Sequence, residues 1–203
     1  MDIYFISLDI FDENGSKIVK NTELKNLQHN ISEDFSKKIL IDIYKNNSDI
    51  IRKNGKPFVK DNSLFLSISH SNSVVAIAFD KNEIGIDIEM KKPRKYNEIL
   101  KYFGINNTEN IDRDEFFKIW TTYEAEYKSG IQESIISFEY KNYICTVSST
   151  NNETPKIYET EIPKDELFRY KNNTNNPKIY DFLPIECKFL PPAKIKLKTA
   201  KNS

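Results

Sequence analysis

The chain has 203 residues, of which 30% are charged, 38% hydrophobic and 12% aromatic. This composition is typical of a folded globular protein and excludes a disordered chain, which would contain fewer aromatic residues. Lys and Arg together number 30, as do Asp and Glu, so the formal net charge is zero. A chain without net charge has no global field that would attract nucleic acid or acidic lipid, so neither is an expected partner.

The first ten residues contain aspartates and no basic leader, so they predict a strand rather than a signal peptide or a membrane span. Cys145 and Cys187 lie far apart in the sequence and neither belongs to a CxxC motif. This pattern indicates neither a zinc site nor a disulfide framework. Together these features predict a reduced protein of the cytoplasm.

The first half of the chain has short elements separated by turn residues. Apolar residues at helical spacing predict an amphipathic helix over 33–45, and Asn54-Gly55-Lys56-Pro57 predicts a turn. Period-two alternation predicts three strands, at 64–69, 74–79 and 83–90, with the loop 70–73 between the first two.

The second half begins with the clearest helix, over 113–129. Phe116, Trp120, Tyr123 and Tyr127 recur at 4-3-4 spacing and are predicted to form its packed stripe, with Gly130 as the C-cap. Three strands are predicted after it, at 135–140, 143–148 and 156–162, followed by an Asn-rich loop at 171–178.

The predicted fold class is α+β, because strands that follow one another through tight turns alternate with a few long helices. We expect an N-terminal subdomain at 1–100 and a C-terminal subdomain at 101–190. Residues 191–203 follow Leu190 as a basic segment that begins with two prolines, and they are predicted to form a flexible tail.

Asp87 and Glu89 are two residues apart on a predicted strand, so their side chains share one face about 7 Å apart. Two carboxylates so placed could converge on a hard cation such as Mg²⁺, which prefers oxygen ligands. The same alternation of isoleucine with an acidic residue is also typical of any strand with one solvated face.

Glu124 and Lys128 lie four residues apart on the predicted helix, a spacing that commonly only stabilises an exposed helix face. Ser69, His70 and Ser71 follow an alternating strand and offer hydroxyl groups and an imidazole, which suit phosphate oxygens. A histidine in a loop is more often an ordinary surface residue. The order of these features in one chain therefore carries the functional prediction.

Four motifs occur in order along the chain: Gly55-Lys56-Pro57, Ser69-His70-Ser71, Ile84-Gly85-Ile86-Asp87-Ile88-Glu89 and Trp120-Thr121-Thr122-Tyr123-Glu124-Ala125-Glu126-Tyr127-Lys128. In these motifs the chain resembles the 4′-phosphopantetheinyl transferase family of the Sfp type, most strongly over residues 55–130. The resemblance implies two similar subdomains in a pseudo-twofold arrangement, each an antiparallel sheet packed with a long helix. The ligand site would lie between them.

The resemblance also implies a reaction. A serine hydroxyl of an acyl or peptidyl carrier protein attacks the β-phosphate of coenzyme A, the carrier gains the phosphopantetheine arm, and adenosine 3′,5′-bisphosphate is released. Asp87, Glu89 and Glu124 would be the ligands of Mg²⁺. Glu124 would also be the general base, either directly or through a metal-bound water.

The remaining implied roles concern coenzyme A. His70, Ser69 and Lys128 would bind its phosphates, and His70 and Lys128 would act with Glu124 in catalysis. Lys56 and Pro57 would face the nucleotide end. Lys37, in the segment Asp34-Phe35-Ser36-Lys37, would bind the 3′-phosphate, although a lysine lacks the bidentate fork of the family's arginine. The partner would be an acidic, helical carrier domain, and the chain would act as a monomer.

Tyr123 departs from the family, which has a lysine at this position. Two interpretations stay open: Tyr123 extends the aromatic stripe of an active enzyme, or it marks a weakened member that binds coenzyme A or a carrier protein without efficient transfer. A remote alternative is a metal-dependent nuclease, because Asp87, Glu89 and Lys91 share one face of the predicted strand.

Overall fold

The computed structural model describes residues 1–11, 14–106, 111–172, 188–190 and 197–199, which form a mixed α+β fold as predicted. The helices within these ranges are α1 (Asn21–Asp42), α2 (Tyr96–Tyr102), α3 (Arg113–Ser129) and α4 (Lys164–Asn172). None of the helices in this part of the chain has both the length and the apolar composition required to cross a bilayer.

The strands within the same ranges are β1 (Asp2–Leu8), β2 (Ile50–Lys53), β3 (Lys56–Val59), β4 (Phe65–Ser71), β5 (Val74–Asp80), β6 (Ile84–Met90), β7 (Ile135–Tyr140), β8 (Tyr143–Ser149), β9 (Lys156–Ile162), β10 (Lys188–Leu190) and β11 (Leu197–Thr199). The first sheet has the order β10-β9-β1-β5-β4 and the second the order β11-β7-β8-β6, while β2 and β3 form a separate hairpin. Strands β1 and β9 run parallel, and the other described pairs are antiparallel.

Two strands leave the sheet of their neighbours in the sequence. Strand β6 follows β5 but pairs with β8 of the second sheet, and β9 follows β8 but pairs with β1 of the first sheet. Each sheet therefore contains strands from both halves of the sequence. The expected subdomain boundary near residue 100 stays a prediction.

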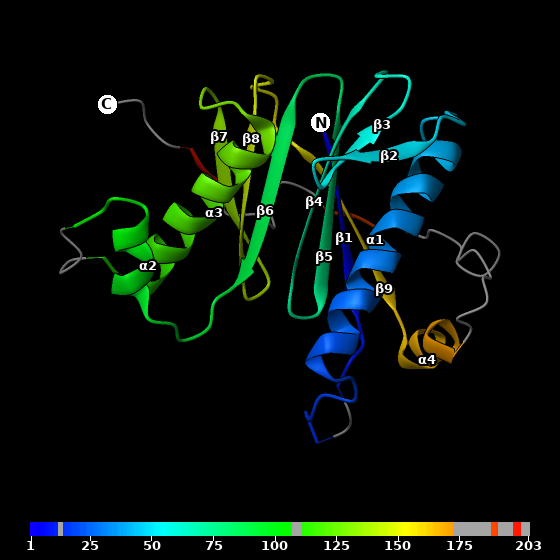
Figure 1. The fold of residues 1–203 in the computed structure, drawn as a ribbon, viewed down its shortest axis with the longest axis horizontal. Helices are drawn as coiled ribbons and strands as arrows, with labels where there is room; N and C mark the ends of the chain where they lie inside the picture. The colour runs from blue at the N-terminus through cyan, green and yellow to red at the C-terminus, as the bar shows by residue number, and fades with distance from the viewer. Residues whose placement is uncertain (12–13, 107–110, 173–187, 191–196, 200–203) are drawn as a thin grey trace.

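Three groups of buried side chains arrange the elements in layers. The first core joins α1, through residues such as Phe35, to one face of β1 and β5. The second lies between the two sheets, where the rings of Phe5 and Tyr140 stack with their centroids 4.0 Å apart. The third joins α2 and α3 to the other face of β8, through Phe117 and Ile144. The resulting order is α1, first sheet, second sheet, α3, and β4 and β6 lie side by side between the helices (Figure 1).

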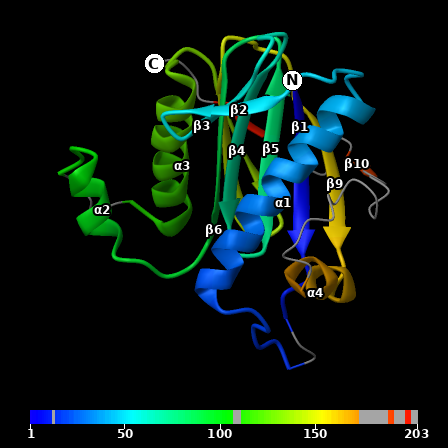
Figure 2. The same cartoon turned by 45° about the vertical axis from the view of Figure 1, so that its right-hand side comes forward.

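Helix α1 begins twelve residues before the predicted start at residue 33 and ends at Asp42 rather than Lys45. The early start has a physical reason, because Leu24, Leu27 and Ile31 continue the buried stripe of Phe35 toward the N-terminus. Figure 2 shows α1 lying across the sheet that contains β1 and β5.

Helix α3 has the predicted bounds, and Gly130 ends it in the left-handed conformation with φ of 76°. The prediction of its packed stripe was wrong at Tyr123 and Tyr127, which are 45% and 69% exposed. The helix instead buries the face of Phe117, Thr121 and Ala125. Small residues on that face allow the helix axis to approach the second sheet closely.

Several smaller differences concern the ends of elements. His70 and Ser71, predicted as part of a loop, belong to β4, and the turn to β5 consists of Asn72 and Ser73. Residues 171 and 172 of the predicted Asn-rich loop end α4, and residues 173–178 lie outside the described ranges. Of the predicted tail, residues 197–199 form β11 against β7, and the rest lies outside the described residues.

Candidate functional site

The junction between the two sheets is built by serines of β4. The backbone N–H groups of Ile86 and Met90 on β6 donate to the hydroxyls of Ser67 and Ser71, each at 3.0 Å. The N–H of Ile88 donates to Ser69 in the same way at 3.3 Å. The backbone N–H groups on this edge of β6 are therefore satisfied by side chains of a neighbouring strand rather than by a backbone ladder.

The same serines hold the two predicted carboxylates. Ser69 Oγ donates to Asp87 Oδ1 at 2.7 Å, and Ser71 Oγ donates to Glu89 Oε2 at 2.9 Å. Each hydroxyl thus accepts from a backbone N–H and donates to the acidic side chain one residue earlier on β6. Both carboxylates are fixed in orientation as a consequence.

Two cations complete the environment of these carboxylates. Lys128 Nζ on α3 donates to Asp87 Oδ1 at 2.7 Å and to the carbonyl of Ile86 at 3.0 Å. Arg94 Nη2, in the segment after β6, donates to Glu89 Oε2 at 3.1 Å. Residues from β4, β6, α3 and the segment after β6 therefore meet at one place.

The carboxylates of Asp87 and Glu89 are largely removed from solvent, so their charge depends on the groups around them. Asp87 is only 6% exposed, and its Oδ2 is buried without a hydrogen-bond partner among the described residues. The pKa of Glu89 is raised above its ordinary value, because the effect of burial exceeds the opposing effect of the nearby Arg94. A buried carboxylate oxygen without a donor is unfavourable, so this position favours a ligand that supplies positive charge.

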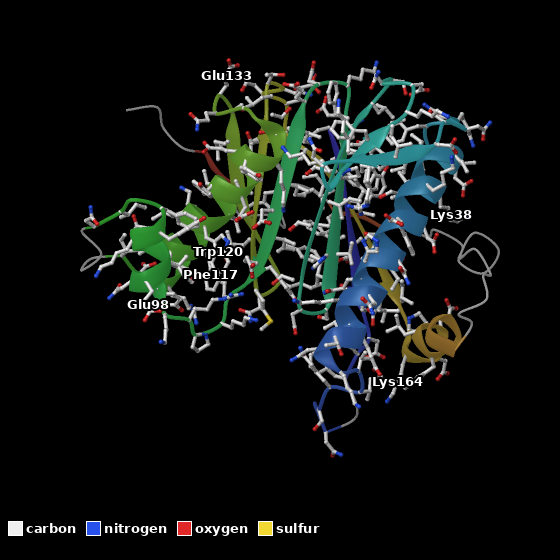
Figure 3. The ribbon with its side chains drawn as sticks, in the orientation of Figure 1. Lys38, Glu98, Phe117, Trp120, Glu133 and Lys164 are labelled. Carbon is white, nitrogen blue, oxygen red and sulfur yellow. The ribbon has the colours of Figure 1, made fainter. Side chains whose placement is uncertain are left out.

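Glu124 lies on α3 one turn before Lys128 and one turn after Trp120, so the three share one helix face. Its side chain is partly exposed and has neither a hydrogen bond nor an ion pair within the described part of the chain. No described contact joins Glu124 to Asp87 or Glu89, although its helix neighbours one turn away, Trp120 and Lys128, contact Arg94 and Asp87. Figure 3 labels Trp120 and Phe117 on this helix.

The three predicted metal ligands do not form a ready-made metal cluster. Within the described ranges, no group of three or more His, Cys, Asp or Glu side chains is placed to hold a metal ion. The residues nevertheless fit a hard cation in chemical terms, because all three offer carboxylate oxygens and Asp87 Oδ2 is an orphaned acceptor. Such an ion would share Asp87 and Glu89 with Lys128 and Arg94.

The residues predicted to bind phosphate differ in their exposure to solvent. Ser69 is buried and its hydroxyl is occupied by Asp87 and the backbone of Ile88, so it holds the carboxylate. His70 is exposed at the surface, and desolvation, followed by the charge of Lys128, lowers its pKa below the ordinary value. Of this group, His70 is exposed and Lys128 is partly exposed.

The residues predicted to bind the nucleotide part of coenzyme A have no described side-chain contact with Asp87 or Glu89. Lys56 Nζ donates to the carbonyls of Tyr127 and Lys128, at 3.0 and 3.3 Å, and so caps the C-terminus of α3. Pro57 lies opposite Arg52 in the β2–β3 hairpin. Lys37 donates to the carbonyl of Ser48 at 2.5 Å and lies 3.4 Å from Asp49 Oδ1. It has no described contact with Asp87, Glu89 or Glu124.

Tyr123 has no described side-chain contact with Asp87, Glu89 or Glu124. Its ring packs against Phe103 with centroids 4.4 Å apart. It also lines an open depression of about 710 Å³ at the C-terminal end of α3, together with Tyr127 and Glu126. Glu133, labelled in Figure 3, belongs to the same depression. The lining of this depression includes none of the three predicted metal ligands.

Lys91, which the nuclease hypothesis requires beside the carboxylates, is engaged elsewhere. Its Nζ lies 3.4 Å from Asp114 Oδ2 and 3.6 Å from Glu139 Oε2. The lysine therefore neutralises a different pair of acids, and no described contact joins it to Asp87 or Glu89.

Sequence reasoning missed Arg94 and the paired role of the β4 serines. The alternation of Ser67, Ser69 and Ser71 was visible, and it has the same period of two as Asp87 and Glu89 on β6. What the sequence does not reveal is that the two strands lie side by side. Arg94 gave no signal, because one arginine in a lysine-rich segment is ordinary.

Comparisons with known proteins supply no family for this chain. No protein-family model matches it, and no curated protein matches it significantly. A functional assignment therefore has to be based on the motifs and on the geometry of Asp87, Glu89, Glu124 and their neighbours.

Proposed function

We propose that the chain is a 4′-phosphopantetheinyl transferase of the Sfp type. It would move the phosphopantetheine arm of coenzyme A onto a serine of an acyl or peptidyl carrier protein. The observation that carries the proposal is the contact of Lys128 on α3, one turn after Glu124, with Asp87 on β6, two residues before Glu89. These residues belong to separate motifs, and Asp87 and Lys128 are 41 positions apart in the chain.

The proposed metal is Mg²⁺, held by Asp87, Glu89 and Glu124, and it would neutralise charge on the diphosphate during transfer. The chain's own residues would do the rest. Lys128 would contact a phosphate oxygen as its bond to Asp87 is shared. His70, with its lowered pKa, would be neutral near pH 7 and could donate one N–H to another phosphate oxygen.

The proton of the attacking serine needs an acceptor. Glu124 is suited to this role because it is partly exposed on a rigid helix and is not engaged by another described residue. Ser69 and Ser71 would hold the β6 carboxylates in place, so that little reorganisation is needed at the moment of transfer.

We also propose that the molecule consists of two similar subdomains in pseudo-twofold arrangement, with the ligand site between them. The elements β1, α1, β4 and β5 have the same succession as β6, α3, β7 and β8. Within their sheets the strands are ordered β1-β5-β4 and β6-β8-β7, so the last strand is central in both. Counted in this way β6 belongs to the second unit, although the boundary expected near residue 100 assigns it to the first; the ligand site would lie where β4 meets β6.

The position of Tyr123 favours an active enzyme over a weakened relic. Its ring packs on Phe103 and lines the depression at the end of α3, so the tyrosine neither blocks nor replaces a predicted ligand. The proposal extends to a monomer of the cytoplasm whose partner is an acidic carrier domain. Direct observation of the product tests it best.

The test is incubation of the purified chain with Mg²⁺, coenzyme A and a panel of apo-carrier proteins, followed by mass spectrometry. We expect the phosphopantetheine mass on at least one carrier. Asp87→Ala and Glu124→Ala should each lower the rate about a hundredfold or more, because each removes a charged group of the reaction centre.

The matched control is Glu126→Ala, since Glu126 lies on the same helix but lines the depression beside Tyr123. Its transfer rate should stay close to that of the wild type. Turnover of Asp87→Ala or Glu124→Ala at the wild-type level under limiting Mg²⁺ would defeat the assignment. Coenzyme A binding without any carrier modification would instead favour the weakened member.

A further inference from the structure

Arg94 has no role in the reaction proposed above, yet it is held in the middle of the site. Its guanidinium carbon lies 4.4 Å from the centroid of the Trp120 ring. On its other side, Nη2 donates to Glu89 Oε2 at 3.1 Å. A planar guanidinium fixed by an aromatic face and a carboxylate has lost much of its freedom before any ligand arrives.

The guanidinium still has donors to offer. Arginine carries five N–H donors and no acceptor. Its Nε is buried and has no hydrogen-bond partner among the described residues, although the side chain as a whole is 27% exposed. A buried N–H without an acceptor is unfavourable, so an oxygen atom supplied by a ligand would satisfy it.

The charge of the site also points to an anion. Asp87, Glu89 and Glu124 carry three negative charges, against the two positive charges of Lys128 and Arg94. A divalent ion on the carboxylates reverses the sign of the local charge. The loaded site then favours an anion, and Arg94 lies beside it with unused donors.

We propose that Arg94 is an anion-binding residue of this site. Its guanidinium shares Glu89 with the divalent ion and donates to an oxygen of a diphosphate bound next to that ion. The identity of the diphosphate as part of coenzyme A rests on the proposed function. The chemistry itself, a diphosphate beside a divalent cation, is testable without it.

Trp120 is the only tryptophan of the chain, so its fluorescence reports on this site without background. The full chain is titrated with pyrophosphate in Mg²⁺ buffer and, separately, with coenzyme A in the same buffer. Arg94→Gln keeps a long polar side chain but removes the charge, and it should raise the dissociation constant for pyrophosphate about tenfold. Arg94→Lys restores the charge without the fork and should recover part of the affinity.

Arg113→Ala is the matched control, because Arg113 is an exposed arginine at the start of α3 that contacts Asp114. It should change the dissociation constant by less than about twofold, since exposed charges at a distance are screened by salt. Thermal unfolding of each variant checks that the fold is retained.

Binding of Mn²⁺, followed by the electron paramagnetic resonance of the free ion, separates ligand binding from a structural role. Removal of a cation that competes for Glu89 should make Arg94→Gln bind Mn²⁺ more tightly while it binds pyrophosphate more weakly. A residue that only supports the fold would weaken both ligands together, and this result would overturn the proposal.

The other outcomes also decide. Unchanged pyrophosphate affinity in Arg94→Gln overturns the role of Arg94, even if coenzyme A binds. Pyrophosphate binding that depends on Arg94, without coenzyme A binding, keeps Arg94 and overturns the transferase proposal. Binding of neither anion by the wild type overturns both. If Arg94→Gln does not fold, Arg94→Lys decides, because wild-type affinity in that variant would show that the fork is not used.

Discussion

The hydroxyls of Ser69 and Ser71 each make two hydrogen bonds in different directions, and this decides where the acidic side chains of β6 point. The sequence suggested that these small donors grip phosphate. In the folded chain their hydroxyls donate to Asp87 and Glu89, and the contact of Ser69 with phosphate stays a prediction.

Cys145 gives a second prediction at the residue scale. It is fully buried on β8, and burial, followed by the charge of Asp87, raises its pKa well above the ordinary value. Because the thiolate is the reactive form, the native thiol should not react with a disulfide reagent at about pH 8. It should react fully in denaturant.

The measurement needs a Cys187→Ser background, because Cys187 carries a second thiol and lies outside the described residues. Absorbance of the released thiol reports the reaction. Rapid and stoichiometric labelling of Cys145 in native buffer would contradict the described packing of β8.

At the scale of elements, the contact between α3 and β6 places Lys128 on Asp87. Gly85 permits it: a Cβ at this position would collide with the carbonyl oxygen of Ala125 and would lie 2.6 Å from the backbone nitrogen of Ser129. Thr121 and Ala125 present a small surface from the helix side. The close approach brings the long side chain of Lys128 within reach of the strand.

Gly85→Ala should therefore destabilise the protein by about 3 kcal/mol or more, since the clash involves backbone atoms that cannot rotate away. Gly55→Ala is the control. At Gly55 no atom lies within 4 Å of the added Cβ, and the change acts only through its φ of +80°, which costs on the order of 1 kcal/mol. Urea unfolding measures both. Equal losses in the two variants would contradict the close approach of α3 to β6.

At the scale of the whole molecule, the exchange of β6 and β9 ties the halves of the chain together. Strand β6 needs β8 as its partner, and β9 needs β1. The serine bridges from β4 to β6 join the sheets at a further place. Neither half of the sequence can complete its own sheet with these pairings.

We therefore expect the chain to unfold in one cooperative transition, with Trp120 fluorescence and far-ultraviolet circular dichroism giving the same midpoint. A fragment of residues 1–100 should show no cooperative unfolding, because it leaves β6 without β8 and β1 without β9. Two separate transitions in the full chain, or a fragment that unfolds cooperatively, would show that the halves are independent.

Much of the local structure could be predicted, and the failures have a common cause. The α3 helix and the paired strands β7 and β8 follow from spacing and turn residues within short windows. The packed stripe of α3 was misplaced because large aromatic side chains were preferred over Thr121 and Ala125. Which face of a helix is buried depends on the shape of its partner, and a window of sequence does not contain that partner.

The sequence by itself determined the period-two strands, the α3 helix with its glycine cap, and the carboxylates at 87, 89 and 124 as the candidate reaction centre. These features depend on residues within a few positions of one another. Only the tertiary structure decided that serines of β4 hold those carboxylates and that Lys128 and Arg94 neutralise them. It also decided that β6 and β9 exchange sheets. Contacts such as Ser69 to Asp87 and Lys128 to Asp87 join residues 18 and 41 positions apart, and no local pattern specifies which distant strands become neighbours.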